Sequence, residues 1–361
     1  MVQGGHCMDR LFFLITVIGL PLSLIGSLLH WPAVLMFLIY CVTIIGLASY
    51  IGRATESLAI IAGPSIGGLL NATFGNAVEL IISLFALREG LVNVVMASIT
   101  GSIIGNLLLV GGLSILLGGF KYKRQQFNIH DAAHNAGILV FSLIVSFIFP
   151  VVFSSKLDPV RVKWLSTVIA SVMILIYLFS LLFRLVTHRG IYKTPTEGDR
   201  EVVLEEERPE WGKGRSILIL GITTIIVALI SERLVGTIEP VGKTIGWSEL
   251  FIGVIIVAIV GNAAEHASAV LMAVKNRIDV AVEISVGSTL QIAMFVAPIL
   301  VLVSWGFQTF MPLIFPVTEL IAMSLATLLT ISITADGDTN WFEGAMLLAA
   351  YVIMGFGFFL L

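Results

Sequence analysis

The chain consists of long apolar stretches separated by short polar ones. A membrane-crossing helix needs about 20 mostly apolar residues to span roughly 30 Å of hydrocarbon. Eleven stretches of this kind occur, at residues 11–29, 32–51, 54–87, 91–119, 131–154, 161–187, 215–236, 248–275, 279–305, 316–334 and 341–361. The pattern therefore predicts an all-α membrane protein with eleven transmembrane helices.

The amino-acid composition also indicates that the protein lies in a lipid bilayer. The chain is 58% hydrophobic and 12% charged, whereas soluble domains average about 45–50% apolar and about 25% charged residues. A net charge of −3 provides no basic field, so nucleic-acid binding is excluded. Cys7 and Cys41 lack metal-ligand spacing, and we interpret both as packing residues.

The first span follows Arg10 and resembles a signal peptide, but it is long and has no small-residue cleavage site. We expect it to remain as a helix. Eleven crossings put the termini on opposite sides of the membrane. Most lysines and arginines, including Lys121, Lys123 and Arg124, then share the side of the N-terminus. Cytoplasmic loops carry this excess, so the N-terminus is predicted inside and the C-terminus outside.

Two motifs recur at one spacing. The sequence GNAVEL at 75–80 returns as GNAAEH at 261–266, and Gly101-Ser102 returns as Gly287-Ser288, both 186 residues later. Each copy holds five spans, an odd number, so the copies are predicted to be inverted repeats. The predicted organisation is an extra N-terminal helix (1–30), a first repeat with helices 2–6 (31–190), a cytoplasmic acidic linker (191–214) and a second repeat with helices 7–11 (215–361). Secondary transporters commonly have this architecture, with the substrate site at the repeat interface.

The third span is unusually long and contains Gly63 and Pro64. Proline removes a backbone donor and glycine permits a break, so this stretch is predicted to end one helix and start another. A discontinuous helix is a pointer to a substrate site. The alternative is a tilted helix that is kinked at the proline and packs through its glycines.

Glu79 and Glu265 lie inside apolar spans at equivalent repeat positions. An ionised carboxylate there costs at least ~2.5–3.5 kcal/mol on insertion scales, so a compensating gain is expected. Asn76 and Asn262 precede the glutamates by three residues and are predicted to share a helix face with them. Together these four residues would offer the hard oxygen ligands that Ca²⁺ prefers.

Two carboxylates that share a low-dielectric pocket cannot both stay ionised without a cation. Either a divalent cation or protons can therefore occupy the pocket and cross the membrane with it, whereas the empty dianion cannot. This exclusion is the chemistry of an antiporter. The alternative is that each glutamate is held neutral by its asparagine and serves only packing specificity.

Polar residues in the neighbouring spans are predicted pocket walls. Ser102 and Asn106 are four residues apart, and Ser288 and Gln291 are three apart, so each pair shares a helix face. Helix–helix hydrogen bonding is the other interpretation of these residues. His266 is either a gate or proton relay, or a hydrogen-bonded core histidine.

Three further features have less defined roles. Asn71 is a possible additional oxygen donor. Glu283 either lines an access path or caps its helix. The acidic stretch 197–210, with Glu205, Glu206 and Glu207, is either a calcium-responsive regulatory segment or a solvated linker.

The two motifs resemble a known family. The segments GGLLNATFGNAVELIISLFAL (67–87), GNAAEHASAVLMAVKNRID (261–279) and VEISVGSTLQIAMFVAP (282–298) are similar to the alpha-repeats of calcium/proton exchangers, often called CAX, in the calcium/cation antiporter superfamily. The resemblance covers nearly the whole chain. Sodium/calcium exchangers, a sister family, typically carry a Ser/Thr-Pro-Glu motif where this chain has Gly-Asn-Ala-x-Glu.

The resemblance implies an antiporter that expels cytosolic Ca²⁺ against protons, with Glu79 and Glu265 as the shared carboxylates. Asn76, Asn262, Ser102, Ser288 and Gln291 would support them, and His266 matches the second motif of the family. The short polar segment before the first span favours a bacterial type in the cell membrane. The predicted partners are Ca²⁺, protons and the lipid bilayer, with a homo-oligomer left open, no enzymatic activity and no cofactor.

Alternatives from other classes remain at this point. The exchanger could be coupled to Na⁺ or accept a broader set of divalent cations. A cation channel would favour an open pore with subunit symmetry around it. A metal-dependent intramembrane hydrolase would need more histidine ligands than the single His266 near the glutamates.

Overall fold

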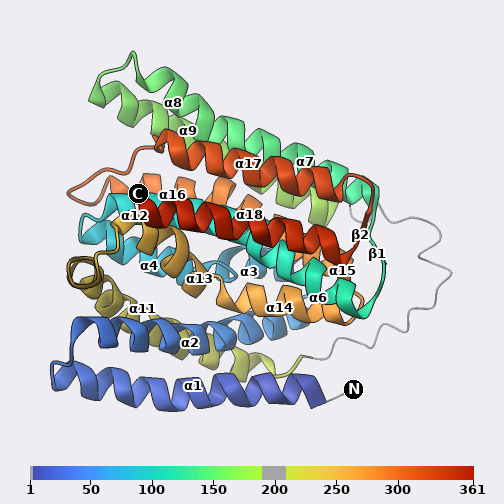
Figure 1. The fold of residues 1–361 in the computed structure, drawn as a ribbon, viewed down its shortest axis with the longest axis horizontal. Coiled ribbons are helices and arrows are strands. Elements are labelled where there is room, and N and C mark those ends of the chain that lie inside the picture. Colours follow the sequence, from blue (N-terminus) through green and yellow to red (C-terminus); the bar gives the residue numbers. More distant parts are fainter. Residues whose placement is uncertain (1–2, 189–208) are drawn as a thin grey trace.

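The computed structural model describes residues 3–188 and 209–361, and in these ranges the protein is an all-α bundle (Figure 1). The predicted fold class is confirmed. The acidic residues Glu205, Glu206 and Glu207 lie outside the described ranges. The elements of the first half are α1 (Gln3–Leu28), α2 (Ala33–Ala62), α3 (Pro64–Phe74), α4 (Ala77–Arg88), α5 (Val92–Ile104), η1 (Gly105–Val110), α6 (Gly111–Lys121), β1 (Gln125–Gln126), α7 (Ile129–Leu143), η2 (Ile144–Ile148), α8 (Phe149–Ser154), α9 (Pro159–Leu182) and η3 (Phe183–Thr187).

The second half follows a similar order. Its elements are α11 (Lys213–Ile245), α12 (Glu249–Phe251), η4 (Ile252–Val257), α13 (Ala258–Gly261), α14 (Ala263–Val274), α15 (Ile278–Gln291), η5 (Ile292–Val296), α16 (Ala297–Ser304), α17 (Val317–Thr334), β2 (Asp338–Thr339) and α18 (Trp341–Leu360). The η elements are π-helical turns inside longer helices. The strands β1 and β2 pair antiparallel and join the polar segment after α6 to the one before α18.

The described residues contain nine helices that are long and apolar enough to cross a membrane. A tenth crossing is obtained if the two parts of the eighth predicted span, which are bent by 61° against each other, are counted as one. The predicted third span is distributed over the end of α2, all of α3 and α4. The count of eleven therefore stays a prediction.

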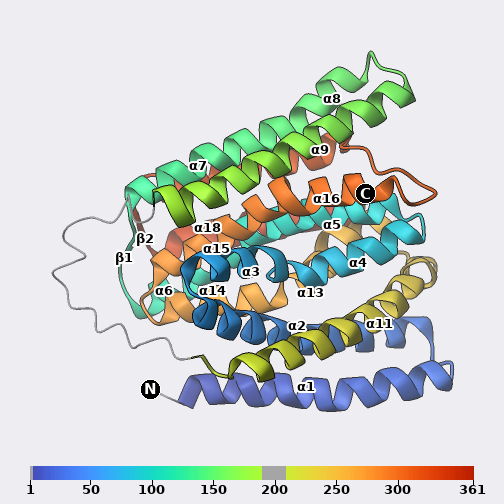
Figure 2. The same cartoon turned by 180° about the vertical axis from the view of Figure 1, so that it is seen from behind.

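The helices are arranged in layers. α1, α2 and α11 lie along one side of the bundle, and α7, α8, α9 and α17 along the other, with α3, α4, α13 and α14 between them (Figures 1 and 2). The outer faces carry exposed large apolar side chains such as Leu14, Val168 and Ile353. The interior contains many buried serine, threonine and asparagine side chains. This distribution suits a protein that is surrounded by hydrocarbon and holds its polar groups inside.

The predicted break at Gly63-Pro64 is confirmed, although its position corrects the predicted span boundaries. α2 continues to Ala62, where spans ending at 51 and starting at 54 were expected. Gly63 has a φ of 80°, which glycine adopts without a Cβ clash. Pro64 then occupies the first turn of α3, where its missing N–H costs no helical hydrogen bond.

Each half also has a break at its repeated motif, and neither of these two breaks was expected. α3 ends at Phe74 and α4 begins at Ala77, while α13 ends at Gly261 and α14 begins at Ala263. Asn76 and Asn262 occupy these breaks, with φ and ψ of −99° and 19°, and of −93° and 6°. The prediction that each asparagine shares a helix face with its glutamate is therefore wrong, because the asparagines lie outside the helices.

Candidate functional site

The two repeated motifs meet in the interior of the bundle. Glu79 and Glu265 each lie in the first turn of a helix that follows a break, α4 and α14. Their carboxylates are close enough to interact electrostatically. Glu79 is 5% exposed, and the Oε2 atom of Glu265 is buried with no hydrogen-bond partner among the described residues.

Each glutamate packs against the glycine of the other motif. A Cβ atom on Gly261 would collide with Cγ of Glu79, and a Cβ atom on Gly75 would lie 3.3 Å from Oε1 of Glu265. The contact is therefore reciprocal between the two halves of the chain. Because glycine has no Cβ, the break of one half can approach the carboxylate of the other.

One hydrogen-bonded chain connects the two halves. Ser102 Oγ donates to Glu79 Oε1 at 2.9 Å, and Asn262 Nδ2 donates to Ser102 Oγ at 2.9 Å. Asn106 Nδ2 donates to Asn262 Oδ1 at 3.3 Å and to Ser288 Oγ at 2.9 Å. The predicted pocket residues of α4, α5, η1 and the break before α14 thus lie together.

The chain of hydrogen bonds continues at the second break. Ser288 Oγ donates to Asn76 Oδ1 at 3.4 Å, and Asn76 Nδ2 donates to Gln291 Oε1. Asn76 therefore contacts α15 of the other half rather than Glu79. All of the predicted wall residues, namely Ser102, Asn106, Ser288 and Gln291, take part in this network, and each of its bonds except Ser102–Glu79 crosses between the halves.

The helices that hold the network approach each other closely. Gly101 of α5 lies against the backbone carbonyl of Val254 in η4, so that a Cβ at this position would overlap that carbonyl group. Gly253 in η4 faces Ala97 and Val94 of α5 in the same way. Glycine at these positions lets α5 and η4 approach closely.

Other predicted residues lie apart from the network. Asn71 is exposed on α3, one turn before the break. Glu283 is exposed on α15 and forms an ion pair with Arg184 at 3.1 Å. α15 begins at Ile278, so Glu283 does not cap it, and that part of the prediction is wrong.

His266 directly follows Glu265 in α14, and its Nε2 atom is buried. No hydrogen-bond partner for this atom exists among the described residues, so Nε2 gives no support to the interpretation as a hydrogen-bonded core histidine. A role as gate or proton relay stays a prediction.

Glu319 was missed by the sequence analysis. It lies in the first turn of α17, is 2% exposed and accepts a hydrogen bond from Thr100 Oγ1. A signal was present, because an acidic residue inside an apolar span is itself unusual. It lies near the start of the predicted span 316–334, where an acidic residue at the membrane surface would also fit, so the sequence alone does not show that it is buried.

The oxygen atoms of this site could hold a hard cation. Two carboxylates, the amide oxygens of two asparagines and two serine hydroxyls surround the meeting point of the breaks. The part of the chain that the structure describes contains no group of three or more His, Cys, Asp or Glu with metal-site geometry. Carboxylate, carbonyl and hydroxyl oxygens are typical Ca²⁺ ligands.

The model of the family described as "Sodium/calcium exchanger protein" matches residues 32–186 and 215–360. The chain belongs to this family. The two matched segments fall on the two halves that carry the motifs. The membership also shows that the chain is a membrane-embedded, multi-span transporter, and the resemblance inferred from the motifs is confirmed.

Individual relatives also support this family membership. The chain is 63% identical to the "Ca(2+)/H(+) antiporter ChaA" of Bacillus subtilis, over 98% of this chain and 100% of that protein. The solved structure of native YfkE has 58% identity, covers 97% of this chain and 100% of its own, and superposes with a TM-score of 0.86. The crystal structure of the H⁺/Ca²⁺ exchanger CAX has 14% identity and a TM-score of 0.72 over 98% and 92% of the two chains, and it shows that the fold is shared.

Ser102 offers a first test of the network. In a Ser102→Ala variant, Glu79 loses a hydrogen-bond donor and Asn262 loses an acceptor. Loss of a hydrogen bond to a charged or buried partner costs about 1.5–3 kcal/mol, so the apparent Ca²⁺ affinity should fall about 10-fold or more. Ser98→Ala is the matched control, because Ser98 is also buried on α5, one turn earlier. Equal affinities of the two variants, measured by calcium flux at varied concentration, would remove Ser102 from the site.

Proposed function

We propose that this protein is a secondary active antiporter that exchanges cytosolic Ca²⁺ for protons by alternating access. Glu79 and Glu265 bind either Ca²⁺ or protons, and Asn76 and Asn262 contribute amide oxygens. The observation that carries the proposal is the reciprocal contact of the two motifs, which brings two carboxylates into one buried oxygen-rich site. The names of the relatives in Bacillus subtilis and in Aphanothece halophytica, both Ca²⁺/H⁺ antiporters, support Ca²⁺ and H⁺ as the two exchanged ions.

The mechanism follows from charge. With Ca²⁺ bound, the two carboxylates are neutralised by the cation. Once Ca²⁺ leaves, their mutual repulsion and burial favour protonation, and the neutral site can return across the membrane. The empty dianion is too costly to move through the apolar interior. Exchange is then obligatory, because neither half of the cycle proceeds without its ion.

The architecture proposed for this cycle is a pair of inverted repeats. α14 starts and ends at positions that correspond to those of α4, and α15 with η5 corresponds to α5 with η1. We assign residues 31–190 and 215–361 to the two repeats, 1–30 to an extra helix and 191–214 to a linker. We propose a location in the cell membrane with the N-terminus in the cytoplasm. In agreement, α1 begins and α18 finishes at opposite ends of the bundle (Figure 1).

Sodium is the second candidate for the counter-ion, because the family description names sodium/calcium exchange. Everted membrane vesicles from cells that express the protein separate the two possibilities. An imposed pH gradient, acidic inside, should drive calcium uptake that collapses when a protonophore dissipates the gradient. A sodium gradient at equal pH should drive none. Calcium uptake that follows the sodium gradient and ignores the protonophore would contradict the proposal.

A further inference from the structure

A third buried carboxylate lies one helix away from the site. Glu319 is as deeply buried as Glu79, and its Oε2 atom receives a hydrogen bond from Thr100 on α5. Thr100 and Ser102 are two residues apart on α5, and residues at this spacing point to different sides of a helix. Glu319 is therefore outside the calcium pocket, but it contacts the same helix that presents Ser102 to Glu79.

The segment 305–316, which leads into α17, is folded into the bundle. Met311, Leu313 and Phe315 are at most 1% exposed, so this segment packs into the bundle just before α17 begins. Its backbone is fixed by hydrogen bonds from Met311 N to Ser304 Oγ and from Leu313 N to Ser166 Oγ. Glu319 itself is 2% exposed although it is only the third residue of its helix.

No cation on the neighbouring elements compensates the charge of Glu319. α17 packs against α5, η1, α7, α18 and β2. The titratable groups on these elements are His130, Asp131 and His134 on α7, Glu343 and Tyr351 on α18, and Asp338 in β2, whereas α5 and η1 have none. Within the described residues, Glu319 makes no ion pair, and the hydroxyl of Tyr351 has no hydrogen-bond partner.

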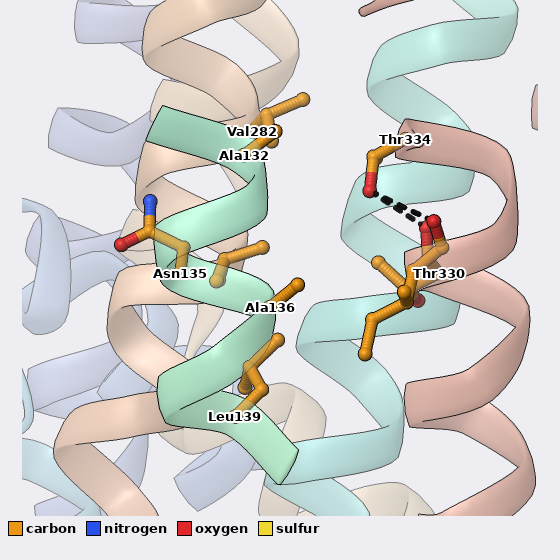
Figure 3. A pocket seen from close by; sticks show the side chains of 9 residues that line it. Ala132, Asn135, Ala136, Leu139, Val282, Thr330 and Thr334 are labelled. Atoms are coloured by element: carbon orange, nitrogen blue, oxygen red, sulfur yellow. Dashed lines mark hydrogen bonds between the residues drawn. The ribbon is translucent and has the colours of Figure 1, made fainter. Parts of the chain in front are cut away.

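The groups on α7 lie at the far end of α17. Ala132 and Asn135 of α7 line a small cavity together with Thr330 and Thr334 of α17 (Figure 3). Thr330 is eleven residues beyond Glu319, which is about 16 Å at a rise of ~1.5 Å per residue. The first turns of α7 are therefore remote from Glu319.

We propose that Glu319 is a proton-binding site separate from the calcium pocket, and that its protonated form holds α17 against α5. The protonated carboxyl is neutral, and its Oε2 atom accepts the hydrogen bond from the Thr100 hydroxyl. Loss of the proton would leave a charge with no counter-ion in the apolar interior, which opposes the contact between the two helices. The native state is then stable while Glu319 is protonated and loses stability as the pH rises.

Thermal unfolding of the purified full-length protein tests this dependence. The melting temperature of the wild type should fall between neutral and alkaline pH. Glu319→Gln keeps the shape of the side chain and an acceptor for Thr100. In this variant the decrease in melting temperature should be at most half as large. The control is Glu239→Gln, because Glu239 is an exposed glutamate on α11, and it should behave as the wild type does. Equal losses in Glu319→Gln and the wild type would overturn the proposal.

Infrared spectroscopy supplies a measurement that does not depend on how Glu319→Gln folds. In the Glu79→Gln, Glu265→Gln double variant at neutral pH, the C=O band of a protonated carboxyl should persist and should disappear at alkaline pH. Absence of such a band at neutral pH would overturn the proposal.

The consequence for transport rests on the proposed function and is measured separately. Exchange of Ca²⁺ for radioactive Ca²⁺ at equal pH on both sides involves no net proton movement, so it measures calcium transport alone. We expect the wild-type rate of this exchange to decline at alkaline pH, where Glu319 loses its proton. In Glu319→Gln the decline should occur at higher pH. An unchanged decline would contradict the role of Glu319. If the protein carried no calcium at all, the proposed function would fail, whereas the unfolding and infrared results would still decide the proton site.

Discussion

Replacing Glu79 or Glu265 by glutamine is expected to reduce pH-driven calcium uptake to the background of vesicles without the protein. Glutamine preserves the size of either side chain, and at position 79 it can still accept the hydrogen bond from Ser102, so the fold should remain. It removes one negative charge from the pair and can neither neutralise Ca²⁺ nor release a proton. Both halves of the exchange cycle therefore lose the group on which they depend.

The measurement is calcium uptake into everted vesicles at matched expression, with size-exclusion profiles as evidence that each variant is folded. Glu283→Gln is a suitable control, because Glu283 is exposed and pairs with Arg184 at the surface. It should transport at nearly the wild-type rate. Substantial uptake by folded Glu79→Gln or Glu265→Gln would refute the role of the pair.

The second large effect is expected at Gly101. In Gly101→Ala, the new methyl group would overlap the carbonyl of Val254, so α5 and η4 must move apart. Overpacking of an interior contact costs about 1–3 kcal/mol, and more when backbone must shift. The displacement also moves Ser102, the next residue, away from Glu79. We expect a lower melting temperature together with a strong loss of calcium transport.

Two alanine substitutions serve as controls for Gly101→Ala. Gly105 lies one turn after Gly101, at the start of η1, and Gly287 occupies the position in the second half that is equivalent to Gly101. A Cβ at either position would have no neighbouring atom within 4 Å. Both variants should keep the melting temperature near that of the wild type. A melting temperature of Gly101→Ala equal to those of Gly105→Ala and Gly287→Ala would mean that the α5–η4 contact is not restrictive.

The sequence predicted which residues meet because the relevant signal is a repetition. Two carboxylates in apolar spans are costly, and their recurrence at one spacing is by itself an indication of a shared site. The same spacing brought in Ser102 and Ser288, and both lie in the network. Apolar stretches of sufficient length likewise predicted the helical bundle.

The helix breaks at Asn76 and Asn262 were not predictable in the same way. Glycine and asparagine inside an apolar run are tolerated in a helix, so local sequence does not decide between a helix and a break. The break is held by tertiary contacts instead, such as those of Asn76 with Gln291 and Ser288 from the other half. Glu319 was missed for a related reason, because its burial arises from the packing of α17 against other helices such as α5, where Thr100 donates to it.

The central claim is that one pair of carboxylates binds either Ca²⁺ or protons. Proton release on calcium binding tests it most directly. Purified protein in weakly buffered detergent solution is mixed with Ca²⁺ while a pH indicator and the bound calcium are recorded together. We predict that the wild type releases protons as it binds Ca²⁺, and that the Glu79→Gln, Glu265→Gln double variant shows neither signal. Calcium binding without proton release, or proton release that persists in the double variant, would contradict the account.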